Sequence, residues 1–202
     1  MLRVGITGGI GSGKTEVRKL FARSGFPTLS ADELAKTISN RNSVVRRRII
    51  RLLGSDAYQA NGTLNRPIVA ERVFGNRKKE RALNAIIHPY VLREVKERFA
   101  ALERKGAPVA LVEAALIYEA GLDRDLDFVI MVDARRDLRT RRVLKRDQTS
   151  AHAIGKRMAA QWSTRRKKNK SQIILRNNGT PGELRSGVLF LASLFQLIAG
   201  SQ

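Results

Sequence analysis

Residues 2–15 read LRVGITGGIGSGKT, a short apolar run that leads into a glycine-rich turn ending in Lys-Thr. The turn fits the spacing Gly-x4-Gly-Lys-Thr, with Gly8 and Gly13 at the fixed glycines and Lys14 and Thr15 at the end. Glycine lets successive backbone N–H groups turn inward around a polyphosphate, where a side chain would block the approach. The spacing therefore predicts a phosphate-binding loop.

The residues around this turn favour the same interpretation. Val4 and Ile6 alternate as in a buried strand, and Val17, Leu20 and Phe21 recur at helical spacing after the turn. A phosphate-binding loop needs a strand before it and a helix after it, a context that a chance glycine-rich turn lacks. The helix then directs the positive end of its dipole at the anion. We therefore expect a nucleoside triphosphate and Mg²⁺ to bind here.

The loop supplies most of the expected nucleotide contacts. Lys14 would act on the β- and γ-phosphates as a catalytic residue, and the Thr15 hydroxyl would bind the metal. The carboxylate of Glu16 would repel phosphate unless it turns away, although its backbone N–H can still donate. The residues expected to contact the nucleotide are Gly8, Gly9, Ile10, Gly11, Ser12, Gly13, Lys14, Thr15 and Glu16.

Size and composition limit the class of protein. The 202 residues, 43% of them hydrophobic, suffice for one domain or for a domain with an inserted subdomain. The absence of cysteine excludes disulfides, thiolate metal sites and cysteine nucleophiles. No signal-peptide pattern opens the chain, and the longest apolar stretch, residues 188–200, is interrupted by Ser193 and Gln196 and is too short to cross a bilayer. We expect a cytoplasmic protein without a membrane partner.

The charge is strongly positive and unevenly distributed. The net charge is +21, from 39 Lys and Arg against 18 Asp and Glu, and such a field attracts polyanions. Residues 135–170 contribute +12 of this total, which favours a clamp for nucleotide phosphates in that segment. Within it, residues 147–170 are polar, arginine-rich and weakly periodic, and we expect a mobile lid. The alternative is an ordinary solvated charged face.

Further short apolar runs alternate with helical patterns. This alternation predicts an α/β fold with a parallel sheet covered by helices. Thr180 and Glu183, at the spacing of a capping box with proline between them, predict the start of a last helix. The predicted strands after the first are residues 28–30, 108–112, 128–132 and 172–175.

Asp32 follows the predicted second strand. The carboxyl ends of strands line the ligand crevice of an open α/β sheet, so Asp32 could face the phosphate loop. Alternatively, Ser30 or Asp32 could cap a helix that begins there. The local sequence does not decide between the two.

Residues 41–105 carry helical patterns and no strand pattern. We expect an inserted helical subdomain, residues 36–105, that covers the acceptor substrate. His88 precedes Pro89, and proline disfavours helix in the residue before it, so the sequence predicts a break in the long helical run there. On local sequence alone, His88 is best read as a polar residue at a helix joint.

Taken together, the motifs resemble those of one family, dephospho-CoA kinase. The likeness extends in the family's order through nearly the whole chain, which is far more specific than a phosphate loop alone. The segments that carry it are ITGGIGSGKT (6–15), SADELA (30–35), GTLNRPIVAERVF (62–74), LNAIIHP (83–89), ALIYEAG (115–121), VDA with KRD (132–147), RMAAQ (157–161) and NNG (177–179).

The resemblance implies a P-loop kinase fold with a five-stranded parallel sheet, a helical CoA-binding subdomain and a lid. It implies transfer of phosphate from ATP, with Mg²⁺, to the ribose 3′-hydroxyl of dephospho-CoA, and it places the Asp32 carboxylate beside that hydroxyl, where it would orient or deprotonate it for attack. Arg66, His88 and Glu119 match positions near the acceptor. The lid side and the adenine side are matched by Arg146 as a catalytic cation, Arg157 and Asn177 as ATP contacts, and Gln161 as a substrate contact.

The chain departs from the family pattern at several positions. Ser30 stands where the family usually has a first acid, Ala115 where it usually has proline, and Glu16 where a second hydroxyl is common. Arg176 replaces an acidic residue before Asn177. The changes at Ser30, Ala115 and Glu16 remove no group that the mechanism requires.

Three other functions compete with this interpretation. A kinase for another small hydroxyl substrate, such as a nucleoside monophosphate, would use the same scaffold but not the His88 segment. A nucleic-acid-binding ATPase would explain the charge of +21, but the chain has only 11 aromatic residues and no recognised nucleic-acid module. We expect weak electrostatic binding of nucleic acid at most, and a monomer. The Asn-Lys-x-Asp motif of a regulatory GTPase is absent, since Asn169 and Lys170 precede Ser-Gln.

Overall fold

The computed structural model describes residues 1–200 apart from 148–149, 151–153, 156–157 and 160. The chain divides into two compact units. The first comprises Met1–Ser30 and Lys96–Gln202, and the second comprises Ala31–Val95. The predicted insertion, residues 36–105, overlaps the second unit, while residues 96–105 belong to the first.

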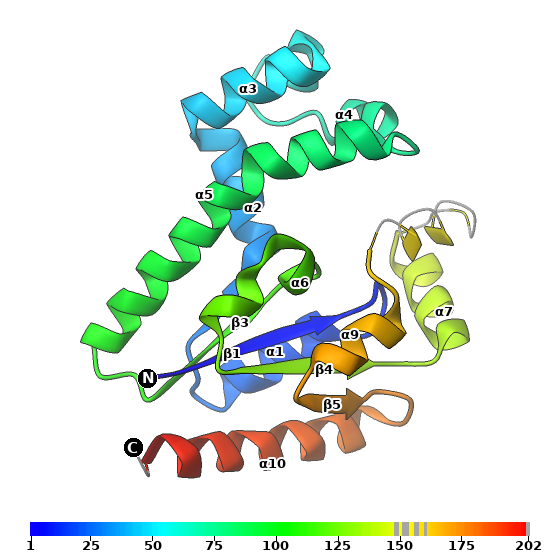
Figure 1. The fold of residues 1–202 in the computed structure, drawn as a ribbon. Helices are drawn as coiled ribbons and strands as arrows, with labels where there is room; N and C mark the ends of the chain where they lie inside the picture. Colours follow the sequence, from blue (N-terminus) through cyan, green and yellow to red (C-terminus); the bar gives the residue numbers. More distant parts are fainter. Residues whose placement is uncertain (148–149, 151–153, 156–157, 160, 201–202) are drawn as a thin grey trace. The chain divides into compact units, whose positions relative to one another are not determined.

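The first unit is built on a five-stranded parallel sheet (Figure 1). The strand order is β2-β3-β1-β4-β5, so the first strand of the chain lies at the centre. The sheet and all five strand positions confirm the predicted α/β fold. The strands are β1 (Leu2–Gly8), β2 (Thr28–Ser30), β3 (Val109–Glu113), β4 (Phe128–Asp133) and β5 (Ile173–Arg176).

Two helices, α1 (Lys14–Arg23) and α10 (Pro181–Gly200), pack on one face of this sheet and on each other. Side chains alternate along a strand, so Val4 and Ile6 point to this face and are fully buried. Phe21 of α1 and Phe195 of α10 stack with ring centroids 6.2 Å apart. The apolar core of the first unit therefore lies between these helices and the sheet.

The start of α10 confirms the predicted capping box. Thr180 N donates to Glu183 Oε2 at 3.1 Å, and Glu183 N donates to Thr180 Oγ1 at 3.2 Å. The apolar stretch 188–200 is part of this longer helix, which by length and composition could cross a membrane, so the prediction that the segment is too short was wrong. Core helices of globular proteins satisfy the same criterion, and five residues of α10 are buried in the core.

The opposite face of the sheet is covered by short elements that follow the strands. Gly5 of β1 faces Ile117 of α6 (Ile117–Ala120), and a Cβ at Gly5 would collide with the Ile117 side chain. Helix α9 (Thr164–Lys170) packs against β4. A 3₁₀ turn, Leu122–Asp125, and the helix α7 (Arg136–Asp147) flank β4 in the sequence.

The second unit consists of helices around a separate apolar cluster. The Asn42 side chain caps α3 by accepting from the N–H groups of Val44 and Val45, both at 3.0 Å. The Tyr58 hydroxyl donates to the Ser39 carbonyl at 2.7 Å and so joins α2 to the turn after α3. Its elements are α2 (Ala31–Arg41), α3 (Ser43–Leu53), the 3₁₀ turn Ser55–Ala57, α4 (Arg66–Val73) and the first part of α5 (Arg77–Arg104).

The predicted break at His88 and Pro89 was wrong. Helix α5 runs without interruption from Arg77 to Arg104, with Pro89 inside it. A proline in a helix removes the hydrogen bond to the carbonyl four residues earlier, here that of Ala85. Pro89 and Ala85 are both exposed, so water can bond to this carbonyl instead.

Candidate active site

The phosphate loop connects β1 to α1 as predicted. Strand β1 ends at Gly8 and helix α1 begins at Lys14. Gly11 and Gly13 have φ angles of 77° and 98°, a left-handed conformation that strongly favours glycine. The Ser12 N–H donates to the Gly9 carbonyl at 3.1 Å and tightens the turn. The loop thus lies at the carboxyl edge of the central strand, where ligands bind in open α/β sheets.

The three residues that end the loop point in different directions. Lys14 Nζ donates to the Gly9 carbonyl at 3.4 Å, so its charge lies over the mouth of the loop. The Thr15 hydroxyl donates to a carboxylate on β3. Glu16 is directed at Arg23, with 4.0 Å between carboxylate and guanidinium, and its side chain is about half exposed. The Glu16 carboxylate is therefore directed along α1 toward Arg23 at its C-terminal end, rather than toward the phosphate position.

Glu113 is a site residue that the sequence analysis did not identify. It is the last residue of β3 and is only 5% exposed. Its Oε1 accepts from Thr15 Oγ1 at 2.8 Å, and its Oε2 accepts from Arg18 Nε at 3.0 Å. The signal in the sequence was an acidic residue directly after the buried run PVALV, at the carboxyl end of a strand.

Asn177 holds the loop from the other side. It is buried, and its Nδ2 donates to the Ser12 carbonyl at 2.8 Å. Its own N–H donates to the Asp133 carbonyl at 2.7 Å, and its carbonyl accepts from Arg142 Nη2 at 3.1 Å. The residue predicted to contact ATP therefore braces the backbone that would cradle the phosphates.

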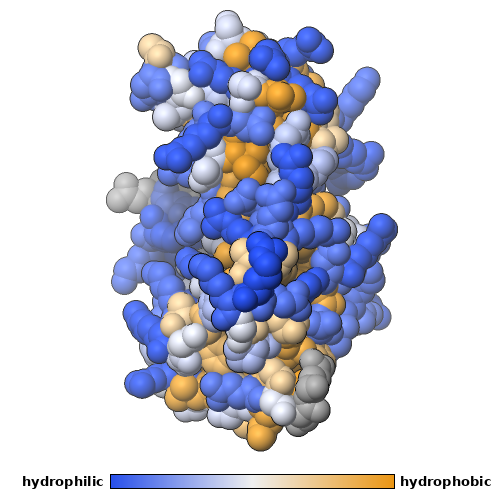
Figure 2. Space-filling model, turned by 90° about the vertical axis from the view of Figure 1, so that its left-hand side faces the viewer, coloured by the Kyte–Doolittle hydropathy of each residue, from blue (hydrophilic) through white to orange (hydrophobic). Residues whose placement is uncertain are grey.

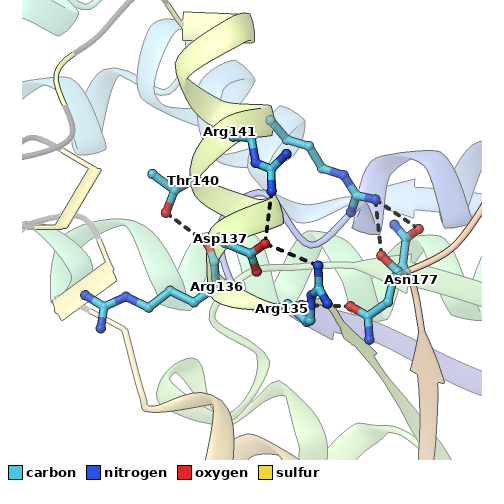
Figure 3. A network of polar contacts seen from close by, with 8 residues as sticks. Arg135, Arg136, Asp137, Thr140, Arg141 and Asn177 are labelled. Atoms are coloured by element: carbon cyan, nitrogen blue, oxygen red, sulfur yellow. Dashed lines mark hydrogen bonds and ion pairs between the residues drawn. The ribbon is translucent and has the colours of Figure 1, made fainter.

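The start of α7 is tied to the same region by a polar network (Figure 3). Asp137 accepts from Arg135 at 3.3 Å and from Arg141 at 3.1 Å. The Arg135 backbone N–H donates to Asn178 Oδ1 at 2.8 Å. The two asparagines of the NNG motif thus hold different segments in place. Asn177 fixes the phosphate loop, and Asn178 fixes the segment before α7.

Glu119, predicted to contact the acceptor, joins α6 to α9. Its Oε1 lies 3.0 Å from Lys167 Nζ and accepts from the Trp162 N–H at 2.8 Å. Lys167 is 1% exposed and also donates to the Ala115 carbonyl at 2.5 Å. Burial lowers the pKa of Lys167, while the Glu119 carboxylate opposes that shift. Glu119 Oε1 thus holds the chain before α9, while Oε2 is buried without a hydrogen-bond partner among the residues that the structure describes.

The predicted lid residues are placed only in part. Arg146 is exposed and forms a two-bond contact with Asp147, at 2.6 and 3.1 Å, which raises the Arg146 pKa. Gln161 lines a cavity beside Gly9. Arg157 lies outside the described residues. The last part of the predicted lid is helix α9.

The remaining predicted acceptor residues lie in the second unit. Asp32 is exposed and lies in the first turn of α2, inside the helix rather than at its cap. A carboxylate there is favoured by the helix dipole. Arg66 is the first residue of α4, and His88 lies within α5. No group of three His, Asp or Glu side chains suited to a metal ion was found among the residues that the structure describes.

The chain is similar to known kinases over nearly its full length. The sequence pattern of the dephospho-CoA kinase family matches residues 2–183. The dephospho-CoA kinase of Corynebacterium efficiens is 34% identical over 186 residues, which cover 92% of this chain and 93% of that protein. The dephospho-CoA kinase of Chlorobaculum tepidum is 39% identical over 191 residues, which cover 93% and 91%.

Solved structures agree in fold. A protein of Thermus thermophilus superposes with a TM-score of 0.78 and 32% identity, over 96% of this chain and 97% of that one. The dephospho-CoA kinase of Campylobacter jejuni gives 0.64 at 22% identity, over 96% of each chain, which supports the fold alone. The family match begins in β1, runs through the phosphate loop and ends in α10, and the chain therefore belongs to the dephospho-CoA kinase family.

Proposed function

We propose how this chain carries out its family's reaction, the phosphorylation of dephospho-CoA to coenzyme A. ATP binds with its phosphates in residues 8–15, and the ribose 3′-hydroxyl of dephospho-CoA receives the terminal phosphoryl group. The observation that carries this proposal is the braced phosphate loop, held by Asn177 on one side and by Glu113 on the other, in a member of this family.

The chemical step is an in-line displacement at the γ-phosphorus of ATP. The 3′-oxygen forms the new bond to phosphorus, and the bond to the β–γ bridging oxygen breaks, so ADP leaves. Asp32 accepts the hydroxyl proton or orients the hydroxyl for attack. The Lys14 ammonium lies at the mouth of the loop. There it would stabilise the negative charge on the β- and γ-phosphates during transfer.

Mg²⁺ fits the oxygen groups near Thr15. This ion prefers oxygen ligands and commonly uses one or two carboxylates together with substrate phosphates. Thr15 would bind it directly, and the Glu113 carboxylate, 2.8 Å from the Thr15 hydroxyl, would orient that hydroxyl. When bound, the ion would neutralise charge on the transferring phosphate.

The other predicted residues are assigned to the two substrates. Arg66 and His88 would contact dephospho-CoA from the helical unit, residues 36–105. Glu119 would serve the acceptor by fixing the backbone at Trp162, next to Gln161. Arg146 and Arg157 would bring charge to ATP from a lid, residues 147–170. For Arg146 this requires that the guanidinium exchange its contact with Asp147 for one with a phosphate, whose oxygens can accept the same two parallel hydrogen bonds.

The partners are proposed to be ATP and dephospho-CoA, with the protein acting as a cytoplasmic monomer. Nucleic acid is expected to bind only weakly and electrostatically, through the net charge of +21. Hydrophilic side chains cover most of the face shown in Figure 2. Such binding should weaken steeply as salt rises, because it depends on release of counterions.

The direct test measures ADP release by the purified protein with Mg²⁺ and ATP. Dephospho-CoA would be compared with AMP, adenosine, pantetheine phosphate and single-stranded RNA as possible partners. Turnover only with dephospho-CoA supports the proposal. Turnover with another acceptor, and none with dephospho-CoA, would retain the ATP site and reject the assignments of Arg66, His88 and Glu119.

A further inference from the structure

One arginine of α7 lies against the phosphate loop. Arg139 is only 8% exposed, although arginine is rarely buried without a partner of opposite charge. Its guanidinium packs so closely on Gly9 that a Cβ added at Gly9 would collide with Nη1. A Cβ added at Gly11 would likewise collide with the backbone carbonyl of Arg139. Arg139 therefore contacts the loop at the mouth, near the Lys14 ammonium.

The contacts of this guanidinium do not neutralise its charge. Nη1 donates to Thr164 Oγ1 at 3.1 Å, and Nη2 approaches Met158 Sδ at 3.6 Å, a weak acceptor. The Nε atom is buried without a hydrogen-bond partner among the described residues. Asp133 attracts Arg139 at longer range but is paired with Lys168 at 2.6 Å. Burial lowers the pKa of Arg139, as expected for a charge removed from water.

A cavity of about 360 Å³ opens beside this guanidinium. Its wall includes Gly9 and Ile10 on the loop side and Arg136 on the helix side. Two cations, Arg136 and Arg139, thus face a space that adjoins the mouth of the phosphate loop, and no carboxylate lines it among the residues described. Such a space is suited to a compact anion.

We propose that Arg139 is a further phosphate-binding residue, whose guanidinium contacts the terminal phosphoryl group of ATP during transfer. Arginine donates in a planar fork that matches phosphate oxygens, and a low-dielectric site strengthens that contact. The anion would supply the negatively charged hydrogen-bond partner that the described residues do not offer this guanidinium. This inference rests on ATP occupying the loop, as proposed above.

The alternative is that Arg139 only links α7 to the segment around Thr164. The two roles differ in what loss of the charge does to the ligand-free protein. If Arg139 is only a structural link, its replacement removes stabilising contacts, and the melting temperature of the ligand-free variant should fall. A phosphate-binding cation is a buried charge without an anion, so replacement by an apolar side chain of similar length should leave the melting temperature unchanged or raise it.

The experiment compares Arg139→Met with Arg141→Met, a control on the exposed side of the same helix. Arg139→Met should lower kcat/KM for ATP by about 10²-fold, the usual effect of removing one donor to a transferring group. The thermal shift produced by a non-hydrolysable ATP analogue should exceed that of ADP in the wild type and in Arg141→Met. In Arg139→Met this difference should disappear, because ADP has no terminal phosphoryl group to contact.

Two results would overturn the inference: a lower melting temperature of ligand-free Arg139→Met with kcat/KM unchanged, or an intact difference between the two nucleotides. Arg139→Gln provides the same comparisons if the methionine variant does not fold. A wild-type protein that discriminates between the nucleotides but does not phosphorylate dephospho-CoA would contradict the proposed function and leave the role of Arg139 supported.

Discussion

The hydroxyl of Thr15 lies 2.8 Å from the buried carboxylate of Glu113, so the end of β3 reaches the residue that closes the phosphate loop. The same carboxylate accepts from Arg18 at 3.0 Å, and this second bond fixes its orientation. Loss of a group that orients a metal ligand typically lowers metal affinity or activity by about 10- to 100-fold. The pair thus couples the sheet to the proposed metal position.

Glu113→Gln is expected to raise the Mg²⁺ concentration that gives half-maximal activity by about 10- to 100-fold, because a neutral amide orients the Thr15 hydroxyl less firmly. Activity titrated with Mg²⁺ at saturating ATP measures this. The control is Glu103→Gln, on an exposed carboxylate that pairs with Arg3. An unchanged Mg²⁺ dependence in Glu113→Gln would mean that this carboxylate has no part in the metal site.

Asn177→Ala should weaken nucleotide binding and stability together. It leaves the Ser12 carbonyl without its donor, and an unsatisfied buried group costs about 1–3 kcal/mol. Denaturant unfolding gives the stability, and calorimetric titration with ADP gives the affinity. Asn178→Ala, at the exposed neighbouring asparagine, should change both much less. Equal effects of the two variants would show that Asn177 does not brace the loop.

Asp32→Asn should reduce kcat by about 10²- to 10⁴-fold, the usual range for loss of a general base, with KM for ATP little changed. Circular dichroism would verify that the variant folds, which is expected because Asp32 is exposed. Glu33→Gln, one residue further along α2, is the matched control. Near-normal kcat in folded Asp32→Asn would remove Asp32 from the chemical step.

The Lys167–Glu119 pair should behave as one unit in stability. Lys167→Met or Glu119→Gln alone leaves the other group buried without its partner, at a cost of about 3–5 kcal/mol. The double variant should cost clearly less than the sum of the two, because no unpaired charge remains. Arg141→Met, at an exposed pair with Asp137, should cost no more than about 1 kcal/mol. Additive costs in the double variant would contradict direct coupling of Lys167 and Glu119.

Arg146→Ala should lower kcat more than it raises KM for ATP, since the proposed contact strengthens as charge develops in transfer. Steady-state kinetics at varied ATP separates the two constants. Lys145→Ala, on the adjacent exposed cation, should leave both near the wild-type values. A rise in KM with kcat unchanged would show that Arg146 binds ATP equally in the ground state and the transition state and does not accelerate the transfer.

The sheet and the phosphate loop could be predicted because their signals are local. Buried parallel strands read as continuous apolar runs, and the loop has fixed glycines whose φ angles only glycine adopts readily. The continuous helix at Pro89 could not be predicted, because it depends on whether Ala85 is exposed to solvent, which is a property of the tertiary structure.

Side-chain partners across the first unit were harder to predict. Glu113 and Thr15 are 98 residues apart in sequence, and Asn177 and Ser12 are 165 apart. Nothing local indicates that these atoms meet. Glu119 was predicted as an acceptor contact from the family resemblance, and its pairing with Lys167 and Trp162 depends on how α9 folds back onto α6.

The position of the new phosphate tests the proposed reaction most directly. Phosphorus NMR of the product formed from ATP, Mg²⁺ and dephospho-CoA would distinguish a ribose 3′-phosphate from other phosphates. The account predicts a stoichiometric 3′-phosphate monoester, identical to that of authentic coenzyme A, together with ADP. Release of inorganic phosphate with dephospho-CoA unchanged, or phosphate at any other oxygen, would contradict it.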